Sequence, residues 1–425
     1  MDLNTEQRTA FDLIMQGQSV FLTGQAGTGK SYLLSHVVQK LSERGKIVGV
    51  TSTTGVSALL IGGTTIHRWS GIRLGELDKE PLYQRATKNG FARKNWKQTS
   101  ILIIDEVSML TPDTLEKLDY VARNMRHSGE PFGGLQLILT GDFCQLPPVK
   151  TDVFCFQSQL WPQLIHRTIE LTQVMRQTDK EFQQILGEIR MGVVTERTRQ
   201  VLESRLNVDV SSGDIKPTKL YSHRKTVDEI NKQHLEEIMS EENHPRVFIA
   251  HKTIASDYQI DQKRALQHMA TLDKSCQARD KLVLAIGAQV MLLHNLFCDE
   301  GLVNGSRGVV IGFEEQRPVV RFMNGLELVI KAHLWELQIN EKITARKNQI
   351  PLILAWATTI HKSQGSTLDC VQMDLGSSIF EYGQFYTALS RAKSLEVLSL
   401  SDLDFDSVRV HPDAEEFYRK LRNSN

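Results

Sequence analysis

Residues 24–31 read GQAGTGKS, a complete G-x-x-x-x-G-K-[ST] pattern, and this stretch decides how the first part of the chain folds. The run before it, Ser19–Thr23, is β-prone, and the run that it opens, Lys30–Arg44, carries apolar residues at helical spacing. In this order of strand, glycine-rich loop and helix, backbone N–H groups surround phosphate oxygens. The sequence therefore predicts a nucleotide site on an α/β sheet.

The positions of this loop have separate expected roles. Lys30 would reach the β- and γ-phosphates, and the Ser31 hydroxyl would be a ligand of Mg²⁺. The other positions would line the phosphates, and these are Gly24, Ala26, Gly27, Thr28 and Gly29. The alternative is a plain glycine-rich turn, which the predicted strand and helix on either side disfavour.

A second polar segment follows the apolar run Ile101–Asp105. It places Asp105 and Glu106 at the carboxyl ends of the strands, where ligands bind in sheets of this kind. Asp105 would hold Mg²⁺ through water, and Glu106 would orient and deprotonate the attacking water. Taken alone, two carboxylates after a strand are as often only a polar strand end.

A third polar segment follows the run Leu135–Thr140. There Gln145 could sense the γ-phosphate, and the pair Pro147-Pro148 would present a rigid edge. A plain proline-rich turn is the alternative for this segment.

The composition of the whole chain limits the other possibilities. Its 425 residues exceed what one hydrophobic core supports, so at least two domains are expected. No apolar run reaches the roughly 20 residues of a membrane span. Fifty basic residues balance fifty acidic ones, so a polyanion would bind a local groove. Five cysteines without a C-x-x-C pair indicate neither zinc nor disulfides and favour a reducing compartment.

The chain divides into segments of different character. Residues 1 to about 175 are predicted to form a doubly wound α/β domain. A second α/β series is expected from the apolar runs at 219–221, 290–293, 352–356 and 397–400. Within it, residues 296–350 alternate apolar with polar side chains, and Asn324-Gly325 is a strong hairpin signal. This segment predicts a small all-β module inserted in the second domain.

Several motifs in a fixed order carry a resemblance to a known family. They are GQAGTGKS, DEVSM (105–109), FGGLQLILTGDFCQLPPV (132–149), ELTQVMRQ (170–177), LAWATTIHKSQGSTLD (354–369) and FYTALSRAKS (385–394). With them the chain resembles the petite integration frequency DNA helicases, RecD-like members of superfamily 1B. One segment departs from the family: the run from Thr51 reads TSTTG, where members more often have an A/S-P/S-T-G run.

The resemblance implies an α/β fold of two RecA-like P-loop NTPase domains with parallel sheets. The first would span 1–175 with a small wedge insertion at about 66–98. The second would span 176–295 and 351–425, with an SH3-like β-barrel, 296–350, inserted in it. The resemblance also implies ATP and Mg²⁺ as cofactors and 5′-to-3′ movement on single-stranded DNA. The substrate would be duplex DNA, or alternatively G-quadruplexes or RNA–DNA hybrids, in replication, recombination, repair and telomere maintenance.

The resemblance also assigns residues position by position. Gln7 matches the residue that reads adenine, and Gly365 matches a residue of the nucleotide site. Arg176 and Arg391 match the arginines that approach the γ-phosphate from the second domain, where such groups accelerate phosphoryl transfer. The positions that match DNA contacts are Thr54, Gly55, His67, Pro147, Val149, His361, Lys362 and Ser363.

Some residues keep two interpretations. Without the resemblance, a histidine after a strand, such as His67 or His361, is more often a structural hydrogen-bonding residue than a DNA contact. Residues 85–97 (RATKNGFARKNWK) are basic and include Phe91 and Trp96. They form either a stacking surface for nucleic acid or a solvated helix face whose aromatic residues anchor it to the core.

Three functions compete on this evidence. They are an ATP-dependent DNA helicase, a phosphate-loop switch that gates partner binding without translocation, and an RNA helicase of the same superfamily. For the helicase, the expected partners are single-stranded DNA and single-strand/duplex junctions, with no membrane. The chain would be a monomer in solution that could oligomerise on DNA. The expected location is intracellular: cytoplasm or nucleoid in a prokaryote or virus, nucleus and mitochondrion in a eukaryote.

Overall fold

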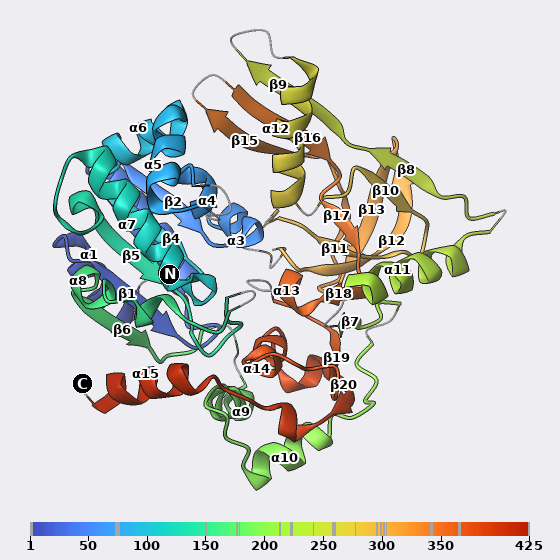
Figure 1. Cartoon of the computed structure of the whole chain (residues 1–425). Coiled ribbons are helices and arrows are strands. Elements are labelled where there is room, and N and C mark those ends of the chain that lie inside the picture. The colour runs from blue at the N-terminus through green and yellow to red at the C-terminus, as the bar shows by residue number, and fades with distance from the viewer. Residues whose placement is uncertain are drawn as a thin grey trace. The chain divides into compact units, whose positions relative to one another are not determined.

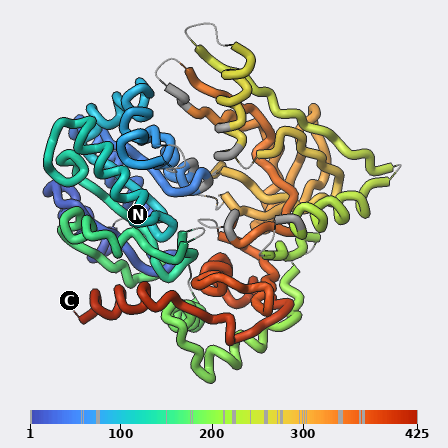
Figure 2. The backbone as a smooth tube through the Cα atoms, viewed as in Figure 1, coloured from blue at the N-terminus to red at the C-terminus, as the bar shows by residue number. Residues whose placement is uncertain are grey.

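Contacts between residues divide the chain into two compact units, whose elements are labelled in Figure 1 and whose backbone is traced in Figure 2. The first unit comprises residues 1–176 and 410–425 with the short segment 339–341, and the second comprises 177–338 and 342–409. The computed structural model describes residues 3–72, 77–148, 151–175, 177, 179–211, 214–221, 224–240, 242–256, 261–276, 278–294, 296–297, 300, 302, 304–340, 343–363 and 367–423.

A parallel sheet forms the centre of the first unit, in the order β3-β2-β4-β5-β1-β6. Its strands are β1 (Val20–Gly24), β2 (Val48–Ser52), β3 (Thr64–Thr65), β4 (Ile101–Asp105), β5 (Gln136–Thr140) and β6 (Arg167–Leu171). All residues of β1 and β4 are buried, as apolar strands covered on both faces must be. The carboxyl ends of β1, β5 and β4 therefore meet at one edge of the sheet.

Helices pack on both faces of this sheet. They are α1 (Thr5–Met15), α2 (Lys30–Glu43), α3 (Gly55–Leu60), α4 (Ile66–Trp69), α5 (Lys79–Lys88), α6 (Gly90–Gln98), α7 (Pro112–Arg126), α8 (Trp161–Leu164) and α15 (Pro412–Asn423), with short 3₁₀ turns at Val107–Met109, Pro131–Gly134 and Cys155–Gln157. Val20 and Leu22 of β1 lie in the core cluster that contains Leu33 of α2. Phe21 stands between them in the strand, so its side chain points to the opposite face of the sheet. There its ring contacts the rings of Trp161 and Phe417.

The region expected to be a wedge contains α4, α5 and α6. Trp96 of α6 is fully buried, its ring meets that of Trp69 with centroids 4.7 Å apart, and its Nε1 donates to the Ser70 carbonyl at 3.0 Å. Trp96 is therefore an anchor of this helix to the core, and the interpretation of it as a stacking residue for nucleic acid was wrong.

Helix α15 belongs to the first unit, although residues 351–425 were all expected in the second domain. Figure 1 shows it beside β6, and Arg422 near its end contacts Glu170 of that strand at 3.0 Å. The expectation failed here because an amphipathic helix shows a buried face in its sequence but not which sheet covers that face.

The second unit also contains a parallel sheet, in the order β18-β7-β19-β20. Its strands are β7 (Thr218–Tyr221), β18 (Ala357–Thr359), β19 (Val371–Leu375) and β20 (Leu398–Leu403). The helices associated with it are α9 (Lys180–Arg190), α10 (Glu196–Glu203), α11 (Arg224–Ile238), α13 (Ile360–Ser363) and α14 (Gln384–Leu389), with 3₁₀ turns at Leu395–Val397 and Phe405–Ser407. Both units are thus α/β, and the fold of two RecA-like domains predicted from the sequence is confirmed.

The rest of the second unit is mainly antiparallel. One sheet has the order β14-β13-β12-β11-β17, another β15-β16-β9, and β8 pairs with β10. The bounds are β8 (Arg246–Ile249), β9 (His251–Ser256), α12 (Gln262–Ser275), β10 (Lys281–Leu284), β11 (Gln289–Leu292), β12 (Arg307–Glu314), β13 (Arg317–Phe322), β14 (Glu327–Val329), β15 (His333–Asn340), β16 (Ile343–Gln349) and β17 (Leu352–Leu354). The predicted hairpin turn is confirmed, because β13 and β14 pair antiparallel around Gly325, whose φ is +83°.

Two expectations for this region differ from the structure. The runs at 290–293 and 352–356 were expected in the parallel series, but β11 and β17 pair with each other antiparallel in the other sheet. An apolar run predicts a buried strand without predicting its direction. The antiparallel strands also begin at Arg246 and continue to Leu354, beyond both ends of the expected barrel at 296–350.

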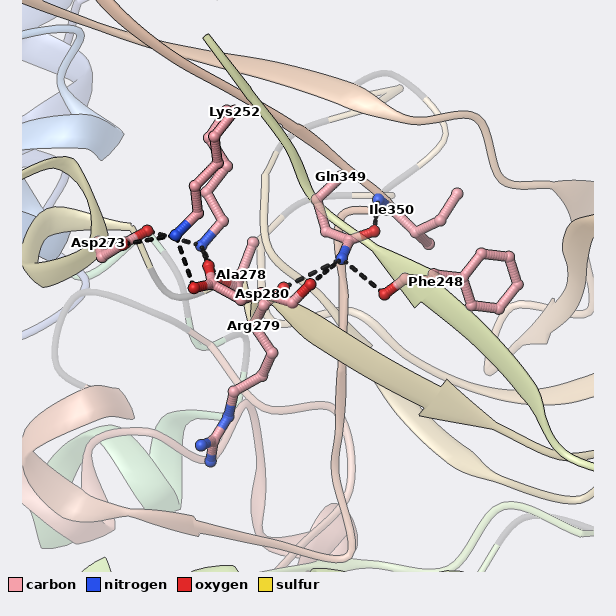
Figure 3. A network of polar contacts seen from close by, with 9 residues as sticks. Phe248, Lys252, Asp273, Ala278, Arg279, Asp280, Gln349 and Ile350 are labelled. Atoms are coloured by element: carbon pink, nitrogen blue, oxygen red, sulfur yellow. Dashed lines mark hydrogen bonds and ion pairs between the residues drawn. The ribbon is translucent and has the colours of Figure 1, made fainter. Parts of the chain in front are cut away.

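A network of charged side chains joins three elements of the second unit (Figure 3). Nζ of Lys347 in β16 donates to Asp273 Oδ1 at 3.0 Å, Asp280 Oδ1 at 2.7 Å and the Ala278 carbonyl at 2.6 Å. Nζ of Lys252 in β9 donates to the second oxygens of the same two aspartates, each at 2.6 Å. The two ammonium groups thus bind α12 and the segment 278–280 to the three-stranded sheet.

Over the residues that the structure describes, no helix combines the length and the apolar character that crossing a lipid bilayer requires.

Candidate active site

The loop after β1 has the backbone geometry that its glycines predict. Gly24 has a φ of +140°, and a Cβ built there would lie 2.3 Å from the Leu171 carbonyl oxygen of β6. At Gly29, where φ is +82°, a Cβ would lie 2.6 Å from Nε2 of Gln7. Only glycine fits both places, so the loop is held tightly between neighbouring elements.

Lys30 opens α2 and turns back over this loop. Its Nζ donates hydrogen bonds to the Gly24 carbonyl at 2.7 Å and the Gln25 carbonyl at 3.0 Å. Below it, Thr28 is buried and its hydroxyl donates to the same Gln25 carbonyl at 2.9 Å. The ammonium group is thus aimed into the curve of the loop, where it can exchange carbonyl oxygens for the oxygens of a phosphate.

Asp105, at the end of β4, is buried and held by two hydroxyl donors. Thr140 Oγ1 at the end of β5 donates to Oδ1 at 2.8 Å, and Ser57 Oγ of α3 donates to Oδ2 at 3.0 Å. Burial raises the pKa of this carboxyl group, while these bonds and the positive charge of Lys30 act in the opposite direction. In the sheet order β4-β5-β1, one strand separates the end of β4 from the strand that leads into the phosphate loop.

Glu106 follows directly and has an unusual backbone conformation. Its φ of 55° and ψ of 44° lie in the left-handed region, which side chains other than glycine rarely adopt. Thr53 fixes this conformation, because its hydroxyl donates to the Glu106 carbonyl at 2.8 Å while its N–H donates to the Asp105 carbonyl at 3.1 Å. Such strain is concentrated at functional sites, where it directs a side chain.

The segment after β5 forms a tight turn at the same edge. The Gln145 N–H donates to the Asp142 carbonyl at 3.0 Å, and the Cys144 N–H donates to Asp142 Oδ1 at 3.2 Å. Gln145 and Pro147 are both buried in this segment. Val149, which was predicted to contact DNA, lies outside the described residues.

Gln7 lies beside the phosphate loop. Its backbone N–H donates to Asn4 Oδ1 at 2.8 Å, and its side-chain Oε1 accepts from the Asn4 N–H at 3.2 Å, which together cap helix α1. Its Nε2 donates to the Thr28 carbonyl at 3.3 Å. The structure thus brings the predicted adenine-reading residue to the loop and gives it a structural role there as well.

Three further predicted DNA contacts of the first unit, Thr54, Gly55 and His67, lie at the start of α3 or in α4. Gly55 begins α3, and Thr54 Oγ1 accepts a hydrogen bond from the Ser57 N–H at 3.2 Å. His67 lies in α4, directly after β3, and burial lowers the pKa of its imidazole. Burial therefore favours the neutral imidazole, which would offer DNA a hydrogen bond rather than a positive charge.

Few of the site residues predicted in the second domain can be described. Arg391 follows α14, and its guanidinium donates to the Thr387 carbonyl at 2.9 Å and to Ser390 Oγ at 2.7 Å. Ser363 ends α13, and its hydroxyl donates to the Ile360 carbonyl at 2.8 Å. The remaining predictions fall outside the described residues, with Arg176 and Gly365 entirely so and His361 and Lys362 as regards their side chains.

Ser31 and Asp105 fit a magnesium ion. A hydroxyl and a carboxylate are the hard oxygen ligands that Mg²⁺ prefers, and it takes its other ligands from water and phosphates. The described part of the chain holds no cluster of three or more His, Cys, Asp or Glu side chains able to bind a metal.

Four residues of this site were missed in the sequence. Ser57 and Thr140 hold Asp105, and Asp142 and Tyr418 shape the turn that carries Gln145. Asp142 stands after a predicted strand, which is a usable signal for a site residue. The hydroxyl residues carry no such signal, because their partners are far away in the sequence.

Comparison with known proteins identifies the family. The PIF1-like helicase family model matches residues 2–200, the DNA helicase Pif1 2B domain matches 268–313, and the UvrD-like helicase C-terminal domain matches 354–398. The ATP-dependent DNA helicase RRM3 of Saccharomyces cerevisiae is 32% identical over 99% of this chain and 68% of its own length. The chain belongs to the PIF1-like helicase family. The ATP-dependent DNA helicase PIF1 of Xenopus laevis is 42% identical over 99% of this chain, which spans only 64% of that relative.

Solved structures of the PIF1-like helicase family agree with this fold. Pif1 helicase from Candida albicans is 35% identical with a TM-score of 0.79, over 99% of this chain and 100% of that one. Bacteroides sp. Pif1 in complex with ADP-AlF4 is 29% identical with a TM-score of 0.80, over 100% and 98%. Bacteroides Pif1 bound to single-stranded DNA is 30% identical with a TM-score of 0.64, over the same shares.

Proposed function

We propose that this chain is an ATP-dependent DNA helicase that moves 5′-to-3′ on single-stranded DNA and unwinds duplex DNA. The observation that carries the proposal is that the phosphate loop with Lys30 follows β1 and that Asp105 and Glu106 stand at the end of β4, two strands whose carboxyl ends lie at one edge of the first sheet. The names of the PIF1 and RRM3 relatives support the activity, and the Bacteroides complexes with ADP-AlF4 and with single-stranded DNA support both ligands.

The residues of the first unit suit the hydrolysis of ATP. Lys30 and the backbone of residues 24–29 would hold the β- and γ-phosphates, and Glu106 would orient a water molecule and take its proton. Ser31 and Asp105 would hold Mg²⁺, which when bound neutralises charge on the phosphates. Gln145 would sense the γ-phosphate, and Gln7 would face the adenine with the second hydrogen of its amide nitrogen.

Residues that were predicted in the second domain would complete the reaction. Arg176 and Arg391 would stabilise charge on the γ-phosphate, and Gly365 would contribute to the nucleotide site. An arginine that engages only when nucleotide is bound makes closure of two domains depend on hydrolysis. That dependence is what converts ATP turnover into movement.

The strand would contact residues of several separate motifs. The proposed contacts are Thr54, Gly55, His67, Pro147, Val149, His361, Lys362 and Ser363. Single-stranded DNA and single-strand/duplex junctions are the proposed partners of a chain that is monomeric in solution. A further solved structure concerns the unwinding of forked double-stranded DNA by two coordinating Pif1 helicases, which supports assembly of this chain on the substrate.

The decisive experiment compares ATP turnover with single-stranded DNA, with RNA of the same sequence, and with neither. Stimulation by DNA, with unwinding only of a duplex that carries a 5′ tail, is the expected result. Lys30→Ala should abolish turnover, whereas Lys40→Ala, an exposed lysine of the same helix paired with Glu43, should not. Stronger stimulation by RNA would favour an RNA helicase, and turnover that no nucleic acid changes would favour a nucleotide-dependent switch.

A further inference from the structure

The hydroxyl of Tyr418 in α15 lies between two catalytic segments of the first unit. It is 2.6 Å from the Thr23 hydroxyl, directly before the phosphate loop. It also accepts a hydrogen bond from the Phe143 N–H at 3.1 Å and donates one to Asp142 Oδ1 at 3.1 Å. Tyr418, Thr23 and Asp142 are all fully buried.

The bonding capacity of this hydroxyl matches its surroundings. A phenol has one hydrogen to donate and two lone pairs to accept with. If its hydrogen goes to Asp142, the two lone pairs take the hydrogens of Thr23 and of the Phe143 N–H. One oxygen atom thus joins β1 to the turn after β5 in a single arrangement.

The same contact reaches Gln145 through Asp142. Oδ1 of Asp142 accepts from both Tyr418 and the Cys144 N–H, and the carbonyl of Asp142 accepts from the Gln145 N–H. A buried carboxylate that loses a hydrogen-bond donor must find another, and its rotation would disturb this turn. Tyr418 therefore helps to fix the conformation of the turn that carries Gln145.

Helix α15 is held firmly enough to act in this way. The Phe417 ring lies 5.3 Å from that of Phe143 and 4.6 Å from that of Phe156. Arg422 contacts Glu170 of β6 with both Nε and Nη2, at 3.2 and 3.0 Å. The aromatic ring of Tyr418 would stay in place if only its hydroxyl were removed.

We propose that Tyr418 is a positioning residue of the ATPase site, which holds the turn that carries Gln145 in register with the phosphate loop. The proposal deepens the proposed function and rests on it for its kinetic part. Without this hydroxyl, the γ-phosphate sensor would sample more orientations, so catalysis would suffer more than ATP binding.

The test uses Tyr418→Phe in the full chain, with Tyr120→Phe as the matched control. Tyr120 is a residue of the same unit whose hydroxyl bonds the exposed Glu80 instead. Hydrogen exchange of residues 141–148 should accelerate about tenfold or more in Tyr418→Phe. Exchange in α7 should stay as in wild type, and Tyr120→Phe should change neither segment.

The kinetic readout is DNA-stimulated turnover against ATP concentration. In Tyr418→Phe, kcat should fall about tenfold to a hundredfold while KM for ATP stays within about twofold. Thr23→Val, which removes one of the three partners, should show the same pattern to a smaller degree and provides a second test if Tyr418→Phe folds poorly.

Wild-type exchange in residues 141–148 together with wild-type kcat would overturn the proposal. Faster exchange throughout the first unit would overturn it too, because Tyr418 would then be only a stabilising residue. A wild-type chain without DNA-stimulated turnover would refute the helicase function instead, and the exchange of residues 141–148 would still decide whether Tyr418 holds the turn.

Discussion

The Ser57 hydroxyl donates a hydrogen bond to Oδ2 of Asp105 across 3.0 Å, which joins helix α3 to the carboxylate at the end of β4. Since Thr140 occupies Oδ1, the rotation of this carboxylate is determined by two hydroxyl groups from different elements. Helix α3 begins at Gly55, a proposed DNA contact. A movement of α3 caused by DNA binding would therefore be transmitted directly to Asp105, the proposed magnesium ligand.

Ser57→Ala should weaken the response to Mg²⁺ without unfolding the first unit. Loss of one orienting hydroxyl at a metal ligand typically costs about tenfold or more in metal affinity. A magnesium titration of ATP turnover checks this, with Ser204→Ala as a control, because that hydroxyl bonds a carbonyl of its own helix α10. Equal magnesium curves for Ser57→Ala and wild type would show that the Ser57 hydroxyl does not orient the carboxylate.

Glu106 should show opposite effects on turnover and on stability. Because a side chain in the left-handed region costs about 1 kcal/mol, Glu106→Gly should leave the unfolding temperature unchanged or raise it. Glu106→Gly and Glu106→Gln should both lose about 10²-fold or more in turnover, since the general base is gone. Calorimetry and single-turnover kinetics measure the two effects, and a marked fall in unfolding temperature for Glu106→Gly would contradict the assignment of strain.

Arg391→Lys should lower kcat far more than it weakens ATP binding. By comparison with other arginines that reach a γ-phosphate, the loss is expected to be on the order of 10³. Lysine keeps the charge but not the planar group that bonds Thr387 and Ser390. Turnover and nucleotide affinity should be measured together, and a loss confined to affinity would make Arg391 a ground-state contact.

The change in stability with pH should depend in part on the protonation of His67. Burial lowers the pKa of this imidazole below its ordinary value of 6.5, so the unfolded chain takes up a proton more readily than the folded one. The contribution of His67 to stability is present above pH 6.5 and is lost as the pH falls through the folded pKa. When the pH is lowered from 7.5 to 5.5, the unfolding temperature of wild type should therefore fall further than that of His67→Gln. An equal fall in both proteins would contradict this prediction.

The charged network of the second unit should depend more on Lys347 than on Lys252. The side chain of Lys347 is 2% exposed and that of Lys252 is 22% exposed. Lys347→Met breaks a buried arrangement and should cost about 3 kcal/mol, whereas Lys252→Met should cost about 1 kcal/mol. Hydrogen exchange of β16 in urea measures both. Lys232→Met, at an exposed pair with Glu236, is the control, and a cost for it like that of Lys347→Met would contradict the prediction.

The parts of the site that could be predicted are those whose residues are adjacent in the sequence. The phosphate loop, Asp105 and Glu106 each stand directly after an apolar run, and parallel strands bring their ends to a common edge. Ser57, Thr140 and Tyr418 could not be found in this way. Their hydroxyl groups meet partners that only the folded sheet brings near, and serine, threonine and tyrosine are common everywhere in a chain.

The limits on predicting the fold have a similar physical origin. Burial of β11 and β17 was visible as apolar runs, but pairing direction depends on the connection between strands rather than on the strands themselves. For Trp96 it was the burial that the sequence left open. A basic helix with an aromatic residue has the same sequence pattern whether the ring faces solvent or the core.

The return of the chain to the first unit at residue 410 affects the order of events during synthesis. A ribosome makes residues 1–176 well before α15. Phe21 and Phe143 therefore lack their contacts with Phe417 until the whole second unit has been synthesised. Until then the nascent first unit has an uncovered aromatic surface that a chaperone could bind. A fragment that ends at residue 176 would keep that surface permanently, and a soluble version of the first unit would need residues 410–423 joined to it.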